Sequence, residues 1–437
     1  MTPSTDEPRR TRAPLTRYLG ALAISLAGTE LSLLALPWFV LVTTGSAART
    51  GVIAACEMAP YVAVQVLGGP LIDRIGARRV SVTSDLASAL VVGAIPALHA
   101  IGALHFDVLA GLVALAGATR GPGDSAKSTL VPDVVARAGV RTERVTGLVG
   151  AAERMAGTVG PAFAGVLIAW RGPLAAMTVD AVTFAVCAVL IATLHLSRVA
   201  TPSETDHGYT RALRAGFTFL RSDPLLRAIV AVIATTNLLD AAMFSVLLPV
   251  WTRDHGHGPA AIGLIASAFG ATALAGSVVA AVAGHRLPRR VIFVVGYLVV
   301  GIPRFAVLAL GAPLSVVVAV HVLAGFGAGF LNPITHAITL ERIPAEALGR
   351  VTSLIEALTW SGIPLGGLVG GALIAAAGLA SALWVCGAVY LAATIAPALR
   401  PAFREMDQPV SGSRLAACNT ATSNTAIALP KTAPPMP

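Results

Sequence analysis

The most regular feature of the chain is an alternation of long apolar blocks with short polar segments. A helix of about 20 apolar residues crosses a hydrocarbon core of roughly 30 Å, whereas a barrel strand needs only about ten residues. The pattern predicts twelve transmembrane helices and excludes a β-barrel. The blocks lie, to within several residues at each end, near 18–44, 50–72, 79–101, 104–128, 145–170, 173–197, 226–252, 259–284, 289–310, 313–338, 350–377 and 379–399.

Composition agrees with this pattern. Of the 437 residues, 55% are hydrophobic and 12% are charged, and the mean hydropathy is +0.78. These values are typical of an all-α integral membrane protein and not of a soluble domain. The first block is too long for the core of a signal peptide and is not followed by a convincing cleavage site, so we expect it to be retained as a helix.

The net charge of +9 follows a topological pattern. Lys and Arg gather in alternate loops, at 73–79, 127–144, 198–227 and 286–290, while the other set of loops holds three, Arg49, Arg171 and Arg253. Cytoplasmic loops carry an excess of Lys and Arg, so both termini are predicted to be cytoplasmic in a multi-pass cell-membrane protein. Topology accounts for the basic charge, and no nucleic-acid partner is expected.

The two halves of the sequence repeat each other. "RVTGLVGAAERMAGTVGP" at 144–161 aligns with "RVTSLIEALTWSGIPLGG" at 350–367, and "GVLIAWRG" at 165–172 aligns with "GALIAAAG" at 371–378 at the same offset. Two parallel six-helix repeats are an architecture of secondary transporters, in which substrate is held between the halves.

The repeat divides the chain into five parts. We expect a six-helix bundle in each half, a linker that carries an amphipathic helix on the membrane surface, and tails of which the C-terminal one is disordered. The parts are a tail at 1–17, a bundle at 18–197, the linker at 198–225, a bundle at 226–399 and a tail at 400–437.

One polar loop, between the second and third blocks, has an unusual composition. "GGPLIDRIGARRV" at 68–80 combines glycines that permit a tight turn with arginines and a single acid. The acid is placed to pair with a cation or helix N-terminus of the other half, in a bond that breaks as the inner side opens. The alternative is an ordinary solvated turn. The residues concerned are Gly69, Asp73, Arg74, Gly76, Arg78 and Arg79.

This loop resembles the signature loop of the major facilitator superfamily, which has glycine, three residues, Asp-Arg, one residue, glycine and then basic residues. It departs at Ala77, where a basic residue is usual. "AGTVGPAFAG" at 156–165 is similar to the helix 5 Gly-Pro motif of the drug:proton antiporters in that superfamily. "ALPWFVL", "GPGDSAKSTLVPD" and "RSDPLLRA" look like the twelve-helix branch that includes macrolide and siderophore exporters.

The resemblance covers nearly all of residues 16–400, and it implies roles for two motifs. Asp73 would bond to the start of the eleventh block, at 350–377, around Arg350, and stabilise the outward-facing state. The corresponding segment of the second half, "GHRLPRR" at 284–290, lacks the acid, so this latch would be one-sided. The helix 5 residues would shape the contact with the opposite half; they are Gly157, Gly160, Pro161 and Gly165.

Three charged residues inside the apolar blocks are candidates for proton coupling or for the substrate cavity. A charge at the bilayer centre costs about 2.5–3.5 kcal/mol on insertion scales, so it needs a reason to persist. Glu30, midway along the first helix, is the first candidate because its carboxyl could take up and release a proton as access alternates. Arg120 occupies the place of the arginine in the family's helix 4 motif, and would bias a nearby carboxyl or bind an anion. Asp240 ranks third, and a structural buried pair is the alternative for Glu30 and Arg120.

Together these features predict a proton-driven exporter of small amphiphilic molecules, such as drugs, antibiotics or siderophores, that works by alternating access. Its partners are the substrate, protons and the lipid bilayer, and we expect a monomer with no cofactor and no metal. A nutrient importer or uniporter of the same fold is the alternative. "GPGD" at 121–124 also matches the pattern of intramembrane aspartyl proteases, but the candidate partner Asp85 lacks the preceding tyrosine, so we do not expect an enzyme.

Overall fold

The computed structural model describes residues 13–67, 69–194, 209–344 and 347–407, with the main chain alone at 66–67, 69–71, 209–215, 285 and 350. The described part of the chain is helical throughout and contains no strand. Its elements are α1 (Ala13–Thr44), α2 (Ala47–Leu67), α3 (Gly69–Ile75), α4 (Ala77–Ala100), α5 (Phe106–Thr129), α6 (Val131–Ala138), α7 (Thr142–Arg171), α8 (Pro173–Ala192), α9 (Tyr209–Ser222), α10 (Pro224–Ala242), η1 (Met243–Leu247), α11 (Leu248–Asp254), α12 (Gly258–Ala283), η2 (Gly284–Arg286), α13 (Arg289–Val300), α14 (Ile302–Ala309), α15 (Leu314–Arg342), α16 (Leu348–Trp360), α17 (Ile363–Ala398) and η3 (Pro401–Asp407).

These elements combine into twelve membrane-spanning helices. Within the described ranges, eight continuous segments are long and apolar enough to cross a membrane. One of them, Val351–Ala398, contains two spans because the chain turns at Gly378, whose φ of 79° breaks α17. With 21, 24 and 30 residues, α2, α5 and α7 are also long enough to cross. The predicted fold class is confirmed.

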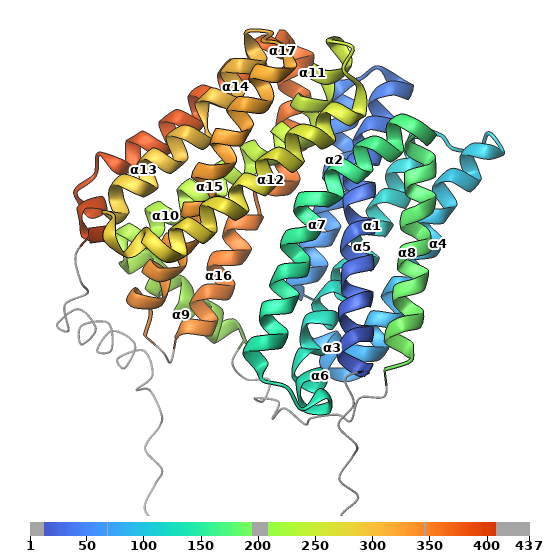
Figure 1. Cartoon of the computed structure of the whole chain (residues 1–437), viewed down its shortest axis with the longest axis horizontal. Coiled ribbons are helices and arrows are strands. Elements are labelled where there is room, and N and C mark those ends of the chain that lie inside the picture. The colour runs from blue at the N-terminus through green and yellow to red at the C-terminus, as the bar shows by residue number, and fades with distance from the viewer. Residues whose placement is uncertain (1–12, 68, 195–208, 345–346, 408–437) are drawn as a thin grey trace, which may run out of the picture.

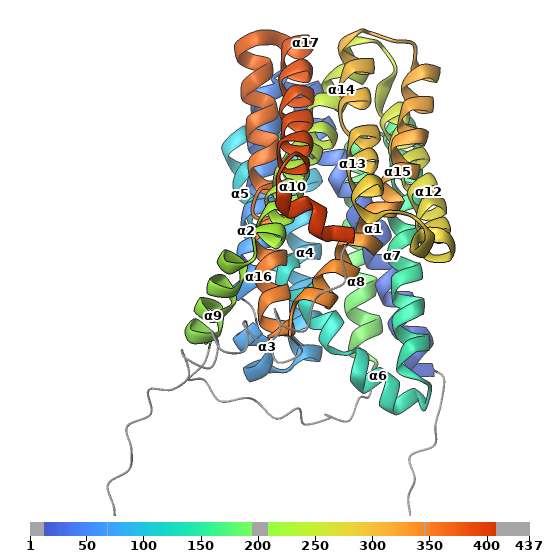
Figure 2. The same ribbon diagram turned by 90° about the vertical axis from the view of Figure 1, so that its left-hand side faces the viewer.

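The helices form two six-helix bundles, α1–α8 and α10–α17, that stand side by side (Figure 1). The short helices α3, α6 and α9 lie at one end, which we call the short-helix face, and the turn within α17 lies at the other end, the opposite face (Figure 2). In Figure 1 the bundles approach each other toward the opposite face and diverge toward the short-helix face. Each turn on the opposite face contains a glycine with positive φ, namely Gly45, Gly102, Gly172, Gly256, Gly258, Gly311 and Gly378.

Glycines allow the two bundles to approach closely along two helix pairs. In α17, a methyl group on Gly371 would lie 2.7 Å from the carbonyl oxygen of Ala47 in α2. In α7, a methyl group on Gly165 would lie 2.8 Å from the carbonyl oxygen of Pro259 in α12. Small residues let membrane helices pack backbone against backbone, and here they do so between the bundles.

The linker and the C-terminal segment contain short ordered elements. The linker contains α9, on which Phe219 and Leu220 are buried. We expected disorder from residue 400 onward, but Pro401–Asp407 forms η3, because Phe403 is fully buried with its ring 5.6 Å from that of Phe293. The rest of the predicted tail, 408–437, lies outside the described residues, as do 1–12 and 195–208.

Candidate functional site

A cavity of about 1050 Å³ lies mainly against the second bundle. Its walls come from α10 between Leu226 and Asn237, from α15 between Asn332 and Thr339, and from α16 and the start of α17 between Gly349 and Ile363. The first bundle contributes Val62 and Gln65 of α2. Because Gly349 is in the first turn of α16, the cavity extends to the short-helix end of that helix.

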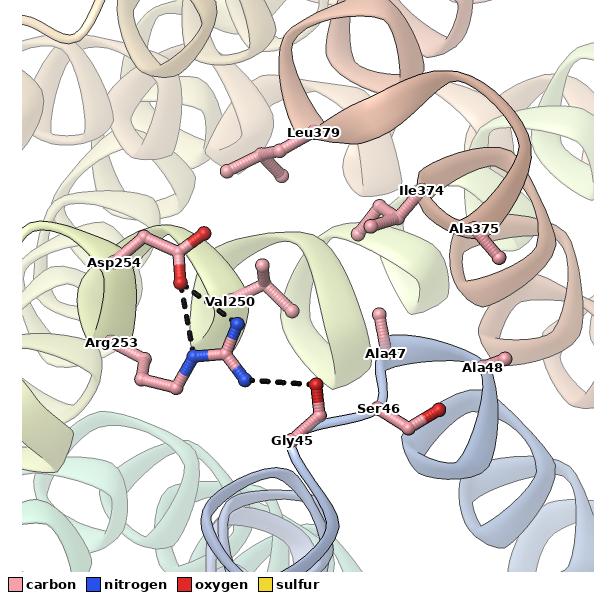
Figure 3. Close-up of a pocket in the computed structure, with 10 residues that line it drawn as sticks. All are labelled: Gly45, Ser46, Ala47, Ala48, Val250, Arg253, Asp254, Ile374, Ala375 and Leu379. Carbon is pink, nitrogen blue, oxygen red and sulfur yellow. Dashed lines mark hydrogen bonds and ion pairs between the residues drawn. The ribbon is translucent and has the colours of Figure 1, made fainter.

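A smaller pocket, of about 400 Å³, lies at the opposite face where the bundles meet (Figure 3). There Arg253 is paired with the neighbouring Asp254 at 2.8 Å, and its Nη1 donates a hydrogen bond of 3.3 Å to the carbonyl oxygen of Gly45. Because Gly45 belongs to the first bundle and Arg253 to the second, this bond joins the two on the side away from the large cavity.

Glu30 lies on α1 with its side chain partly buried. It packs on Gly160 of α7, where a methyl group would lie 2.7 Å from Glu30 Cγ. A glycine at 160 therefore makes the space that the glutamate occupies. Within the described part of the chain, the Glu30 carboxylate has no ion pair, so a change in its protonation would not break one.

Arg120 on α5 is buried and is held by α2. Its Nη1 lies 3.2 Å from Oε1 of Glu57, and its guanidinium stacks 4.4 Å above the ring of Tyr61. Its Nε lies 3.8 Å from Asp124, one turn along α5. Glu57, which is 5% exposed, was not among the residues singled out from the sequence. The sequence does contain a signal for Glu57: it is a carboxylate within an apolar block, which is the feature that selected Glu30.

A second buried ion pair joins α4 to α5. Lys127 Nζ lies 2.9 Å from Asp85 and 3.5 Å from Asp124, and donates a hydrogen bond of 2.8 Å to Ser25 of α1. The sequence predicted Lys127 to be one of the cations of the loop at 127–144, and this prediction was wrong. The helix α5 continues to Thr129, and Lys127 is 2% exposed inside the bundle. The side chain contacts two aspartates and a serine and so links α1, α4 and α5.

Asp240 pairs within the second bundle. Its Oδ1 lies 2.5 Å from Nη2 of Arg304, which is fully buried and stacks 5.3 Å from the ring of Phe269. The three sequence candidates therefore do not form one cluster: Arg120 binds Glu57, Asp240 binds Arg304, and Glu30 packs on Gly160.

The loop at 68–80 is more helical than expected. Gly69 begins α3, and among the residues of this loop that the structure describes only Gly76 has the positive φ that a tight turn requires, at 95°. Arg78 donates a hydrogen bond to the carbonyl oxygen of Ala192 at the end of α8, as a cation at a helix C-terminus does. The remaining charged side chains, Asp73, Arg74 and Arg79, are exposed.

The latch stays a prediction. The carboxylate of Asp73 has no ion pair among the side chains that the structure describes, and the side chain of its expected partner, Arg350, is outside them.

The Gly-Pro motif at 156–165, on the fifth predicted span, lies on α7 and contacts both the other bundle and its own. Gly165 and the carbonyl oxygen of Pro161 pack against Gly263 of α12, and the carbonyl oxygen of Gly157 lies 3.0 Å from where a methyl group on Gly270 would be. Gly160 faces Glu30 within its own bundle. One helix thus contributes both to the contact between bundles and to the surroundings of the first candidate for proton coupling.

Other polar side chains in the described part of the chain form no metal site. No group of three or more His, Cys, Asp or Glu residues there could hold a metal ion. Asp180 accepts a hydrogen bond from Ser32, and His255 stacks on Trp251 at 4.5 Å.

Comparison with known families and structures shows which protein family the chain belongs to. The family model of the Major Facilitator Superfamily matches residues 18–238 and 230–417. The chain belongs to this superfamily. Members of the superfamily are transporters and not enzymes, and both aspartates that the protease alternative needs, Asp85 and Asp124, contact Lys127.

Relatives with known names and structures span most of the chain. It is 32% identical over 402 residues to the "Multidrug efflux pump Tap" of Mycobacterium tuberculosis, covering 91% of this chain and 95% of that one. It is 29% identical to the "Multidrug efflux pump Tap" of Mycolicibacterium fortuitum, covering 91% and 98%. The fold matches a point mutant of the nucleoside transporter NupG, with a TM-score of 0.72 at 15% identity, covering 90% of this chain and 99% of that one. It also matches a bacterial homologue of the iron transporter ferroportin in an inward-facing state, with a TM-score of 0.68 at 18% identity, covering 90% and 98%.

Proposed function

We propose that this protein is a multidrug exporter of the cell membrane that exchanges small amphiphilic molecules for protons by alternating access. The main support for the proposal is the cavity of about 1050 Å³, which is lined by apolar side chains together with amides and hydroxyls. Such a lining suits molecules that are partly apolar. The relatives named multidrug efflux pumps, at up to 32% identity over almost their whole length, support export as its purpose.

The proposed orientation has both termini in the cytoplasm and the short-helix face inward. The exposed cations on that face support it, among them Arg74 and Arg79 on either side of Gly76. In this orientation the large cavity opens toward the cytoplasm, and the bond between Arg253 and Gly45 closes the outer side.

Alternating access requires the outer contacts to separate as inner ones form. The outer bond from Arg253 is a charge-assisted hydrogen bond at a partly exposed site, so it is weak enough to break in each cycle. On the inner side we propose the pair between Asp73 and Arg350 as the contact that replaces it. The protein would work as a monomer, because both gates lie within one chain.

Proton coupling is proposed to run through Glu30. A carboxyl without a fixed cation can be neutral when it faces a dry environment and charged when water reaches it. Glu30 meets this condition, whereas Glu57 and Asp240 each face an arginine that favours the charged form. Arg120 would act on the site through its fixed charge, and no cofactor is needed.

The test uses inverted membrane vesicles with an imposed proton gradient. Wild-type protein should accumulate ethidium and the uncharged drug chloramphenicol, and each addition of drug should release protons. Glu30→Gln should abolish the accumulation of both drugs, because the neutral amide can neither take up nor release a proton. Glu143→Gln removes the same charge from the exposed start of α7 and is the matched control. Normal export by Glu30→Gln, or export that survives collapse of the gradient, would exclude this coupling.

A further inference from the structure

The large cavity has an unbalanced charge. The described residues that line it include one carboxylate, Glu356, and one histidine, His336, but neither lysine nor arginine. Glu356 lies near the middle of α16 and is exposed to the cavity. A carboxylate on the wall of a cavity attracts cations that enter it and repels anions.

Three other carboxylates of the bundles are already paired with cations. Glu57 pairs with Arg120, Asp85 with Lys127, and Asp240 with Arg304. Glu356 has no ion pair within the described part of the chain. It therefore remains available to a cation that arrives from solution.

The surface next to Glu356 suits an organic cation. Thr352, Glu356 and Trp360 are spaced at i, i+4 and i+8, so they follow one another along the same face of α16, and all three line the cavity. The ring of Trp360 is 44% exposed. An aromatic ring one turn from a carboxylate offers a flat surface on which a delocalised or alkylated cation can rest.

We infer that Glu356 is the counter-ion that makes this cavity select amphiphilic organic cations, with Trp360 as the aromatic surface beside it. The inference rests on the proposed function and narrows its substrate class. The carboxylate supplies the charge, α10 and α15 supply apolar and amide contacts, and uncharged molecules of the same shape bind without using Glu356.

Binding to the purified full-length protein tests this directly. The probes are tetraphenylphosphonium and the uncharged triphenylphosphine oxide, which share a phenyl-substituted phosphorus centre. Glu356→Gln should weaken tetraphenylphosphonium binding about tenfold or more and change triphenylphosphine oxide binding less than twofold, while Glu356→Asp should retain part of the preference for the cation. Glu143→Gln, on the exposed start of α7, is the matched control and should bind both probes as the wild type does.

Any of three binding results would overturn the inference: no tetraphenylphosphonium binding by the wild type, an equal loss of both probes in Glu356→Gln, or no loss at all. An unchanged thermal unfolding midpoint shows that the variants are folded. Export of the uncharged drug chloramphenicol separates this inference from the proposed function. If Glu356→Gln stops chloramphenicol export, Glu356 carries the proton and the inference fails. If the wild type exports no drug, the proposed function fails, whatever the binding preference.

Discussion

The two bundles follow the same course through the membrane but place their charges differently. Among the described residues, the first bundle buries two cation–carboxylate pairs, Arg120 with Glu57 and Lys127 with Asp85, deep between its helices. The second bundle pairs Arg304 with Asp240, whose side chain is one-third exposed, and Arg342 at the end of α15 with Asp223 and Glu405. Most of the polar side chains that line the large cavity also come from the second bundle. Repeated architecture therefore does not imply repeated chemistry: the two most buried ion pairs lie in the first bundle, and most polar side chains of the cavity wall lie in the second.

The largest effect is expected from breaking the buried pair of the first bundle. Lys127→Met leaves Asp85 charged, 2% exposed and without its nearest cation. Removing one partner of a buried pair costs about 3–5 kcal/mol, so the free energy of unfolding in detergent should fall by roughly that amount. The double variant Lys127→Met/Asp85→Asn should recover most of the loss, because no unpaired charge remains. Equal stability of the single variant and the wild type would contradict a structural role for this pair.

A smaller effect is expected from the second bundle. Asp240→Asn removes the charge opposite Arg304 but keeps a hydrogen-bonding group, and water already reaches the aspartate. A hydrogen bond to a charged group contributes about 1.5–3 kcal/mol, and the exposure of Asp240 reduces this toward the lower limit. Measuring the free energy of unfolding of Asp240→Asn in detergent tests this prediction. A loss as large as that of Lys127→Met would remove the difference between the bundles.

The smallest effect on stability is expected at the cavity wall. Asn332 on α15 is exposed and lines the cavity, so Asn332→Ala should change the free energy of unfolding by no more than about 0.5 kcal/mol. Drug binding, measured in parallel, should change more than stability does, because the side chain faces the ligand. A strong destabilisation would show that this wall holds the bundle together as the first bundle's pairs do.

The helices could be predicted from sequence because each apolar block is long and ends at polar residues. The block predicted at 313–338 is α15, Leu314–Arg342, and the one at 104–128 is α5, Phe106–Thr129. The partners of the buried charges could not be predicted in the same way. Arg120 and Glu57 are 63 residues apart, and Lys127 and Asp85 are 42 apart, so their contacts depend on how separate helices pack.

Lys127 shows how one helical turn changes an interpretation. The segment "GPGDSAKSTLVPD" contains glycine, proline and charged residues, which favour a loop. The helix continues through Pro122 because Lys127 finds two carboxylates and a serine inside the bundle. A boundary error of a few residues therefore separates a surface cation from a buried one.

The glycine turns of the opposite face leave almost no protein outside the helices there. Gly172 alone separates α7 from α8, and the two spans within α17 are separated at Gly378. Few peptide segments on that face are long enough to enter the active-site cleft of a protease or to fill the binding site of an antibody fragment. Reagents raised against the folded protein should therefore recognise the short-helix face, and a tag for detecting the protein belongs on that side.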